Sequence, residues 1–230
     1  MIIRANIYID GFNLFYGCLK NTNYKWLNIN KLAGLYFPKY EIQTIKYFSA
    51  AVKARKNDLN KPVRQQTYFR ALNTLKNVKI ILGTFLESEV KMYVPEKDSK
   101  GNRQKANVSL NGIPAKLPLL DPNHLIARKT EEKGSDVNLG THLIIDAYEK
   151  KFDIAIVISN DSDLAEPIRI INNHIGLKVR LLNPYPNTNF KLQRAVNGDI
   201  KNIRQSALKA SQFTDNLVDI NGSFHKPFGW

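Results

Sequence analysis

The sequence predicts an α/β protein with a central, mostly parallel sheet and one inserted β-hairpin. Strand-like and helix-like segments alternate along the 230 residues, a pattern that right-handed crossovers between parallel strands produce. The segment Ile154–Ile158 is apolar throughout, which is typical of a strand buried on both faces. Polar residues follow it immediately at Ser159–Asp163. Since open α/β sheets bind ligands just beyond the carboxyl ends of their strands, we expect the functional site there.

The elements of the first half follow from apolar patterning and from residues that begin or end helices. Alternating or consecutive apolar and β-branched residues predict the strands. Gly11 permits a turn before the first helix, the second helix ends before Pro38, and Pro62 stands where a helix tolerates proline, in its first turn. In order, we predict a strand at Ile2–Ile9, helices at Leu14–Leu19 and Ile29–Tyr36, a strand at Glu41–Val52, a helix at Val63–Leu75 and a strand at Val78–Leu82.

The second half resumes the alternation after an extended segment and a turn at Gly134. Ser135 or Asp136 begins a helix whose apolar positions continue to Tyr148, and the buried strand at Ile154–Ile158 follows it. The remaining predicted elements are a helix at Leu164–Ile171, a strand at Val179–Leu182 that ends at the Asn183 and Pro184 turn, and a short helix at Phe190–Val196.

The segment Thr84–Pro118 departs from this alternation. Its apolar residues alternate on either side of a polar turn at Glu96–Asn102, so we predict an inserted β-hairpin with a flexible tip. Two roles stay open for its basic residues, a solvated surface or an arm that grips the substrate. The predicted organisation is therefore a domain at 1–204 that contains the hairpin at 84–118, and a C-terminal extension at 205–230 packed on the domain.

Net charge favours a polyanionic partner. The formal charge is +14 at pH 7, and the segments Lys46–Lys79 and Lys178–Lys209 are rich in lysine and arginine, with one acidic residue in each, Asp58 and Asp199. Nucleic acid is the simplest partner of such a chain, and a generally basic protein without such a partner is the alternative.

Other features exclude several classes of protein. A single cysteine, Cys18, excludes an internal disulfide framework and a cysteine-based zinc site. No apolar run approaches the length of a membrane span, and the first residues resemble a strand rather than a signal peptide, so we expect no membrane partner and a cytoplasmic location. The chain lacks the GxGxxG pattern and any flavin or nicotinamide signature, which disfavours a redox role.

Four aspartates stand at ends of strands or starts of helices: Asp10, Asp136, Asp161 and Asp163. Each fits a helix cap or the first turn of a helix, which is the simpler interpretation. Gathered at one edge of a parallel sheet, however, they would repel one another unless a cation lay between them. Carboxylate oxygens select hard cations such as Mg²⁺ or Mn²⁺, which activate water for attack on phosphorus.

Three sequence motifs resemble those of the NYN domain family, which belongs to the PIN-like nuclease superfamily and includes LabA-like bacterial proteins. The motifs are Asp10 with Asn13 after the first strand, Lys133, Gly134, Asp136 and Val137 before a helix, and Ser159, Asp161 and Asp163 after a later strand. The resemblance covers roughly Ile3 to Leu182. It implies a three-layer PIN-like sandwich and a Mg²⁺- or Mn²⁺-dependent ribonuclease site. Asn160 stands where the family commonly has glycine, so we expect a turn that suits asparagine, which accepts left-handed backbone geometry better than most residues.

The resemblance and the residues together assign roles. Asp10, Asp136, Asp161 and Asp163 are the predicted catalytic and metal-binding residues; Asp161 is the better candidate for a direct ligand, while Asp163 binds a second metal or only caps a helix. Asn13, Ser159 and Asn160 are expected to support the ligands. Lys133, Lys53, Arg55 and Lys56 are expected to contact phosphates. The predicted function is a metal-dependent endoribonuclease that hydrolyses phosphodiester bonds in single-stranded or structured RNA. The alternative is an RNA-binding or regulatory NYN protein without significant catalysis, and a homodimer is one open assembly.

Two further groups lie outside this assignment. On an ideal helix, Asp146 falls about 80° from the face of Asp136, so we expect a surface or polar-contact role for it. Tyr68, Phe69 and Phe190 neighbour basic segments. They either stack on bases or, as is more common for such residues, belong to the core.

Overall fold

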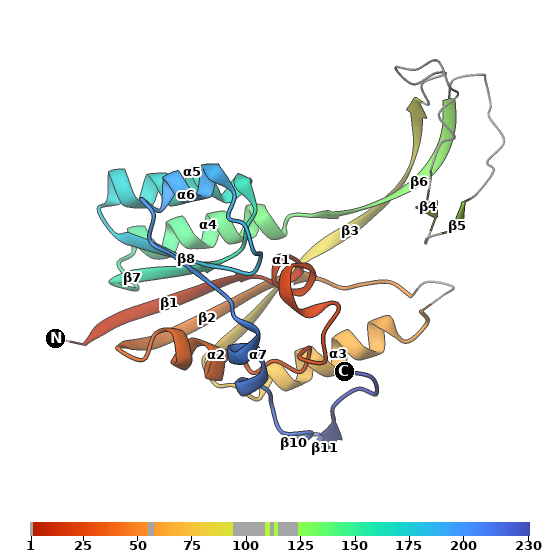
Figure 1. The fold of residues 1–230 in the computed structure, drawn as a ribbon, viewed down its shortest axis with the longest axis horizontal. Helices are drawn as coiled ribbons and strands as arrows, with labels where there is room; N and C mark the ends of the chain where they lie inside the picture. Colours follow the sequence, from red (N-terminus) through yellow and green to blue (C-terminus); the bar gives the residue numbers. More distant parts are fainter. Residues whose placement is uncertain (1, 55–57, 94–108, 111–112, 115–123) are drawn as a thin grey trace. The chain divides into compact units, whose positions relative to one another are not determined.

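The structure is a computed structural model that describes residues 2–54, 58–93, 109–110, 113–114 and 124–230 (Figure 1). Its strands are β1 Ile3–Asp10, β2 Tyr40–Ala50, β3 Val78–Tyr93, β4 Ser109–Leu110, β5 Ile113–Pro114, β6 His124–Lys133, β7 Ile154–Ile158, β8 Lys178–Asn183, β9 Ile200–Asn202, β10 Asn216–Asp219 and β11 Gly222–His225. Its α-helices are α1 Gly11–Leu14, α2 Ile29–Tyr36, α3 Lys61–Asn73, α4 Ser135–Tyr148, α5 Ala165–Ile170, α6 Phe190–Ala195 and α7 Gln205–Ala210. Single turns of other helix types occupy Phe15–Leu19, Ser162–Leu164 and Ile171–Ile175.

The described chain divides into two compact units. The first comprises Met1–Thr84 and Lys133–Trp230, and the second is Phe85–Glu132. The second unit holds the outer part of β3, the antiparallel pair β4 and β5, and nearly all of β6. The predicted strand at Val78–Leu82 proves too short, because the apolar alternation continues and β3 extends to Tyr93. The polar turn of the predicted hairpin, 96–102, lies outside the described residues.

A six-stranded parallel sheet forms the centre of the first unit and confirms the predicted fold class. Its order is β3-β2-β1-β7-β8-β9, and β6 lies next to β3 in the sheet. From β1 the chain builds outward through β2 and β3, and from β7 it builds outward in the opposite direction. Such a reversal between neighbouring strands is where doubly wound sheets form their sites. The carboxyl ends of β1 and β7 lie side by side there, with Ile9 opposite Ile158.

Alternation along β1 sends side chains to two separate cores. Ile7 and Ile9 join the core shared with α2 and α3, whereas Tyr8 joins the core shared with α4, α5 and α6. Figure 1 shows these two helix layers on opposite sides of the sheet. All five residues of β7 are buried because both faces are covered, as its continuous apolar sequence predicted. None of the described helices combines the length and apolarity that crossing a bilayer requires.

Aromatic residues of the C-terminal segment pack on the α2 and α3 side. Trp26 is fully buried and its ring contacts those of Phe213, Phe224 and Trp230. The Trp26 indole Nε1 also donates a hydrogen bond of 2.9 Å to the carbonyl oxygen of Thr214. Residues after α7 thus complete the core around one side chain of the N-terminal half.

Asp146 is buried, so a surface position for it is wrong and a polar contact is what the fold provides. Its exposed fraction is 1%. The Tyr8 hydroxyl donates to Oδ2 at 2.7 Å, the Lys46 ammonium contacts the same oxygen, and the Lys151 ammonium lies 3.2 Å from Oδ1. The helix projection could not show what packs on Asp146, because its partners Tyr8 and Lys46 come from β1 and β2.

Candidate metal centre

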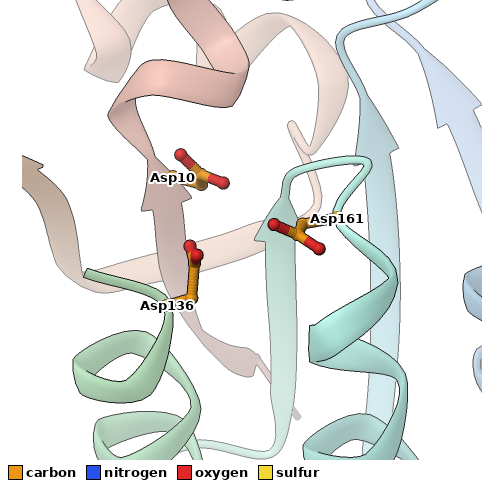
Figure 2. A group of neighbouring side chains, drawn as sticks. All are labelled: Asp10, Asp136 and Asp161. Carbon is orange, nitrogen blue, oxygen red and sulfur yellow. The ribbon is translucent and has the colours of Figure 1, made fainter. Parts of the chain in front are cut away.

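Three aspartates from three elements converge at the reversal point of the sheet. Asp10 ends β1, Asp136 lies in the first turn of α4, and Asp161 follows β7. One carboxylate oxygen from each lies within 4.8 Å of the other two. Figure 2 shows the three side chains pointing toward one another. We call these residues the aspartate triad.

Asp10 is the most buried member and is held by hydrogen bonds at both oxygens. It is 4% exposed. Oδ1 accepts from the backbone N–H of Asn13 at 2.9 Å, and Oδ2 accepts from the Ser159 hydroxyl at 3.1 Å. The same hydroxyl oxygen accepts from the backbone N–H of Asp161 at 3.0 Å. Ser159 therefore links two members of the triad. The cap by Asp10 also explains why the first helix begins at Gly11 rather than at Leu14.

Asn13 and Asn160 connect the loops on either side of the triad. The side-chain oxygen of Asn13 accepts from the backbone N–H of Asn160 at 2.9 Å. The Asn160 side chain then donates to the carbonyl of Asn187 at 3.0 Å and accepts from the N–H of Asn189 at 2.7 Å. The expected left-handed backbone is absent, since Asn160 is not among the described non-glycine residues with positive φ. Asparagine serves here through its side chain, which a glycine would lack.

Glycines place Asp136 beside the sheet. Gly134 caps α4 at a φ of 93°, a conformation that glycine adopts without strain. At Gly83 of β3, a Cβ atom would lie 2.7 Å from the carbonyl oxygen of Lys133, so only glycine lets the start of α4 approach so closely. Sequence reasoning missed Gly83, although a glycine inside a strand often marks such an approach.

The fourth predicted ligand and the predicted phosphate contacts are exposed or lie outside the described residues. Asp163 is exposed, and its backbone N–H donates to Asp161 Oδ1 at 3.0 Å, so Asp161 caps the short turn in which Asp163 lies. Lys133 and Lys53 are exposed. Arg55 and Lys56 lie outside the described residues. The roles of all four basic residues, and of Asp163 as a ligand, stay predictions.

The three aromatic residues near basic segments divide between the core and the surface. Tyr68 and Phe69 are buried in the core, as the commoner alternative predicted. Phe190 is 61% exposed, and the Arg194 guanidinium lies 4.1 Å from the centre of its ring. Phe190 therefore remains a candidate for stacking on a base.

The charge of Asp10 reaches two tyrosines. Burial first, and then the Asp10 charge, raises the pKa of Tyr47 and the pKa of Tyr185. Tyr47 packs directly against the residue after Asp10, since a Cβ atom at Gly11 would lie 2.7 Å from the Tyr47 hydroxyl oxygen. Both hydroxyls therefore stay protonated at neutral pH.

The donor set of the triad fits a hard divalent cation. Two carboxylates within 4.8 Å of each other repel by on the order of 3 kcal/mol or more at an effective dielectric constant of about 20. A cation held between them converts this repulsion into attraction. Oxygen donors without nitrogen or sulfur favour Mg²⁺ or Mn²⁺ over softer metals. Among the described residues, the triad offers such a set of carboxylate oxygens.

Comparisons with known proteins identify a family and a shared fold. The NYN domain model matches residues 87–202. These residues include Asp136 and Asp161, while Asp10 enters the site from the strand that pairs with β7.

Two individual proteins are similar to the chain. One is 6-hydroxy-3-succinoylpyridine 3-monooxygenase HspA of Pseudomonas putida (strain DSM 28022 / S16), 28% identical over an alignment of 224 residues that covers 86% of this chain. The chain spans 64% of the length of that relative. The other is the crystal structure of a protein of unknown function, VPA0982, from Vibrio parahaemolyticus RIMD 2210633. Its TM-score is 0.53 at 16% identity, with 88% of this chain and 94% of that chain covered, which shows a shared fold.

Proposed function

Because this chain belongs to the NYN domain family, whose fold is nuclease-like, we propose that it is a metal-dependent endoribonuclease. The observation that carries the proposal is the convergence of Asp10, Asp136 and Asp161 at one point of the sheet. A protein that only bound RNA would gain nothing from carboxylates facing phosphates. Hydrolysis adds water across one phosphodiester bond. The water oxygen bonds to phosphorus, the bond from phosphorus to one ribose oxygen breaks, that oxygen takes a proton, and the other proton goes to solvent.

The residues of the chain supply the positioning for this reaction. Asp10, Asp136 and Asp161 would hold Mg²⁺ or Mn²⁺, and such a cation supplies Lewis-acid activation of water and stabilisation of the leaving oxygen. Ser159 keeps Asp10 and Asp161 in register through its two hydrogen bonds, and Asn13 ties the two loops together. Fixed ligands of this kind preserve the geometry that an in-line attack requires.

The charge of the chain supports RNA as the substrate. The net charge of +14 attracts a polyanion and makes binding strongly dependent on salt. Lys133, next to the triad in sequence, and Lys53 are the described cations that we propose contact phosphates, together with Arg55 and Lys56.

Removal of divalent metal tests the proposal. We expect the purified protein to cleave one or more RNAs in Mg²⁺ or Mn²⁺, to lose this activity in EDTA and to regain it when either metal is returned in excess. Cleavage is followed on end-labelled single-stranded and hairpin RNAs, and binding is measured in parallel at several salt concentrations. Undiminished cleavage in EDTA contradicts the metal mechanism. Salt-dependent binding without cleavage on every RNA class supports the RNA-binding alternative.

The Pseudomonas putida relative supports a second candidate, oxygenation of a pyridine-ring acid, since 86% of this chain aligns with it. Oxygen uptake with 6-hydroxy-3-succinoylpyridine and a nicotinamide or flavin reductant tests this activity. We expect no uptake above the background without substrate, because the chain lacks a dinucleotide-binding fingerprint. Oxygen uptake that depends on the substrate, and that an Asp10→Asn variant has lost, would replace the ribonuclease proposal.

A further inference from the structure

A cavity of about 290 Å³ lies next to Asp10. Gly11 and Phe12, which follow Asp10 in the chain, line it together with Tyr47. Its volume lies just below the range for small-molecule sites, about 300–1,000 Å³, so it suits one nucleotide rather than an extended strand. Further aromatic residues from distant parts of the first unit line it: Phe15, Tyr16, Tyr68, Phe69, Phe228 and Trp230.

Two of these rings are left open to solvent. Phe228 is fully exposed and Tyr16 is 49% exposed. An exposed phenylalanine keeps a large apolar surface in water. A planar ring that stacked on Phe228 would cover this surface, and every nucleobase has a face suitable for such stacking.

Positive charge lies among the aromatic residues. Lys25, Lys61 and Arg64 line the cavity, against one carboxylate, Asp58. Arg64 pairs with Asp58 at 2.5 Å, and the Lys25 ammonium donates to the carbonyl of Thr22 at 2.7 Å. Burial first, and then the nearby positive charge of Arg64, lowers the pKa of Lys25. A bound anion would offset this repulsion between the two cations.

We propose that this cavity binds one nucleobase with its phosphate, next to the site where the RNA is cut. An apolar ligand would make no use of the positively charged residues that line the cavity, and an inorganic anion would leave the aromatic walls uncovered. A planar heteroaromatic ring that carries a phosphate satisfies both features. This inference rests on the proposed ribonuclease function, which identifies RNA as the source of the base. A free mononucleotide offers the same chemistry.

The two tryptophans provide a direct test by NMR of their indole N–H signals. Trp230 lines the cavity, whereas Trp26 is buried and hydrogen-bonded to Thr214; a Trp230→Phe variant assigns the two signals. AMP, CMP, GMP and UMP, and separately a short single-stranded RNA, are titrated into the protein in EDTA so that no cleavage occurs. We expect a saturable shift of the Trp230 signal, with a smaller shift of the Trp26 signal.

Variants at the rim test the stacking and the phosphate contact separately. Phe228→Ala should weaken binding at least about fivefold, the lower limit for loss of one base stack. Lys25→Gln should reduce the salt dependence of RNA binding by about 0.7 in the slope of log K against log salt. Ile220→Ala and Lys31→Gln are matched controls. Ile220 is fully exposed outside the cavity, and the Lys31 ammonium donates to one backbone carbonyl, as that of Lys25 does.

Each outcome decides the proposal. A shift with mononucleotides identifies free nucleotides as sufficient ligands, and a shift with RNA alone identifies the base as part of a chain; both support the cavity assignment. Absence of a saturable shift with either ligand overturns it, as does unchanged binding by both Phe228→Ala and Lys25→Gln. The ribonuclease proposal is judged separately by cleavage in Mg²⁺. A wild type that binds nucleotides and cuts no RNA refutes only the ribonuclease, and one that cuts RNA without the Trp230 shift refutes only the cavity.

Discussion

Replacing Asp10 by asparagine is expected to reduce metal-dependent RNA cleavage by more than ~100-fold, since even residues that only support metal ligands cost 10–100-fold in affinity or activity. Asp10 is the most buried of the three aspartates, and its negative charge cannot be replaced by solvent. The asparagine retains an oxygen for the N–H of Asn13, and its amide group can donate to the Ser159 hydroxyl oxygen. The variant should therefore fold and still bind RNA. Single-turnover cleavage rates in Mn²⁺, together with RNA binding in EDTA, measure the effect.

Two further variants sharpen this prediction. Asp153→Asn removes a carboxylate at the opposite ends of β1 and β7, where Asp153 pairs with Arg4, and cleavage should stay within a few-fold of the wild type. Asp163→Asn tests whether Asp163 binds a second metal or only caps a helix. We expect a smaller loss of cleavage than for Asp10→Asn because Asp163 lies outside the described triad. Wild-type cleavage by Asp10→Asn would exclude the triad as the catalytic centre.

Replacing Asp146 by asparagine is expected to lower the free energy of unfolding by about 3–5 kcal/mol, the usual cost of removing one partner from a buried ion pair. The side chain of Asp146 is 2% exposed and that of Lys46 is 12% exposed, so the lysine charge would remain without a buried anion. The Tyr8 hydroxyl would also lose its charged acceptor. Urea denaturation at pH 7 measures the change, with Asp153→Asn as the control. The Arg4 and Asp153 pair is nearly half exposed, and such pairs contribute about 0–1 kcal/mol.

The pH dependence of this difference has a definite sign. Burial alone would raise the pKa of Asp146, but the hydrogen bonds from Lys46 and Tyr8 and the Lys46 charge outweigh it and lower the pKa. A carboxyl group whose folded pKa is depressed stabilises the protein above its unfolded pKa, about 3.9. This contribution is lost as pH falls through the folded value. The stability gap between wild type and Asp146→Asn should therefore be constant near neutral pH and close below about pH 4. A gap that widens in acid would contradict this assignment.

The sequence alone predicted the sheet and the edge of the sheet at which the candidate site lies, for a local physical reason. The periodicity of apolar residues that indicates a strand or a helix can be recognised within a short segment. The wholly apolar segment Ile154–Ile158 needs both faces covered wherever it lies in the fold. Parallel strands bring their carboxyl ends to one edge, so aspartates after β1 and β7 were expected to meet. Two of the predicted bounds, Ile29–Tyr36 and Ile154–Ile158, coincide with α2 and β7.

Only the tertiary structure decided which polar groups meet and what surrounds them. The sequence made Asp161 the better candidate for a direct ligand than Asp163, and the direction of the chain after β7 brings Asp161 into the triad and exposes Asp163. Asp146 became a buried ion-pair partner because residues of β1 and β2 cover its face of α4. The cavity joins Gly11, Arg64 and Trp230, which lie far apart in the chain. A periodic pattern states which residues share a face, whereas packing between distant segments determines what that face contacts.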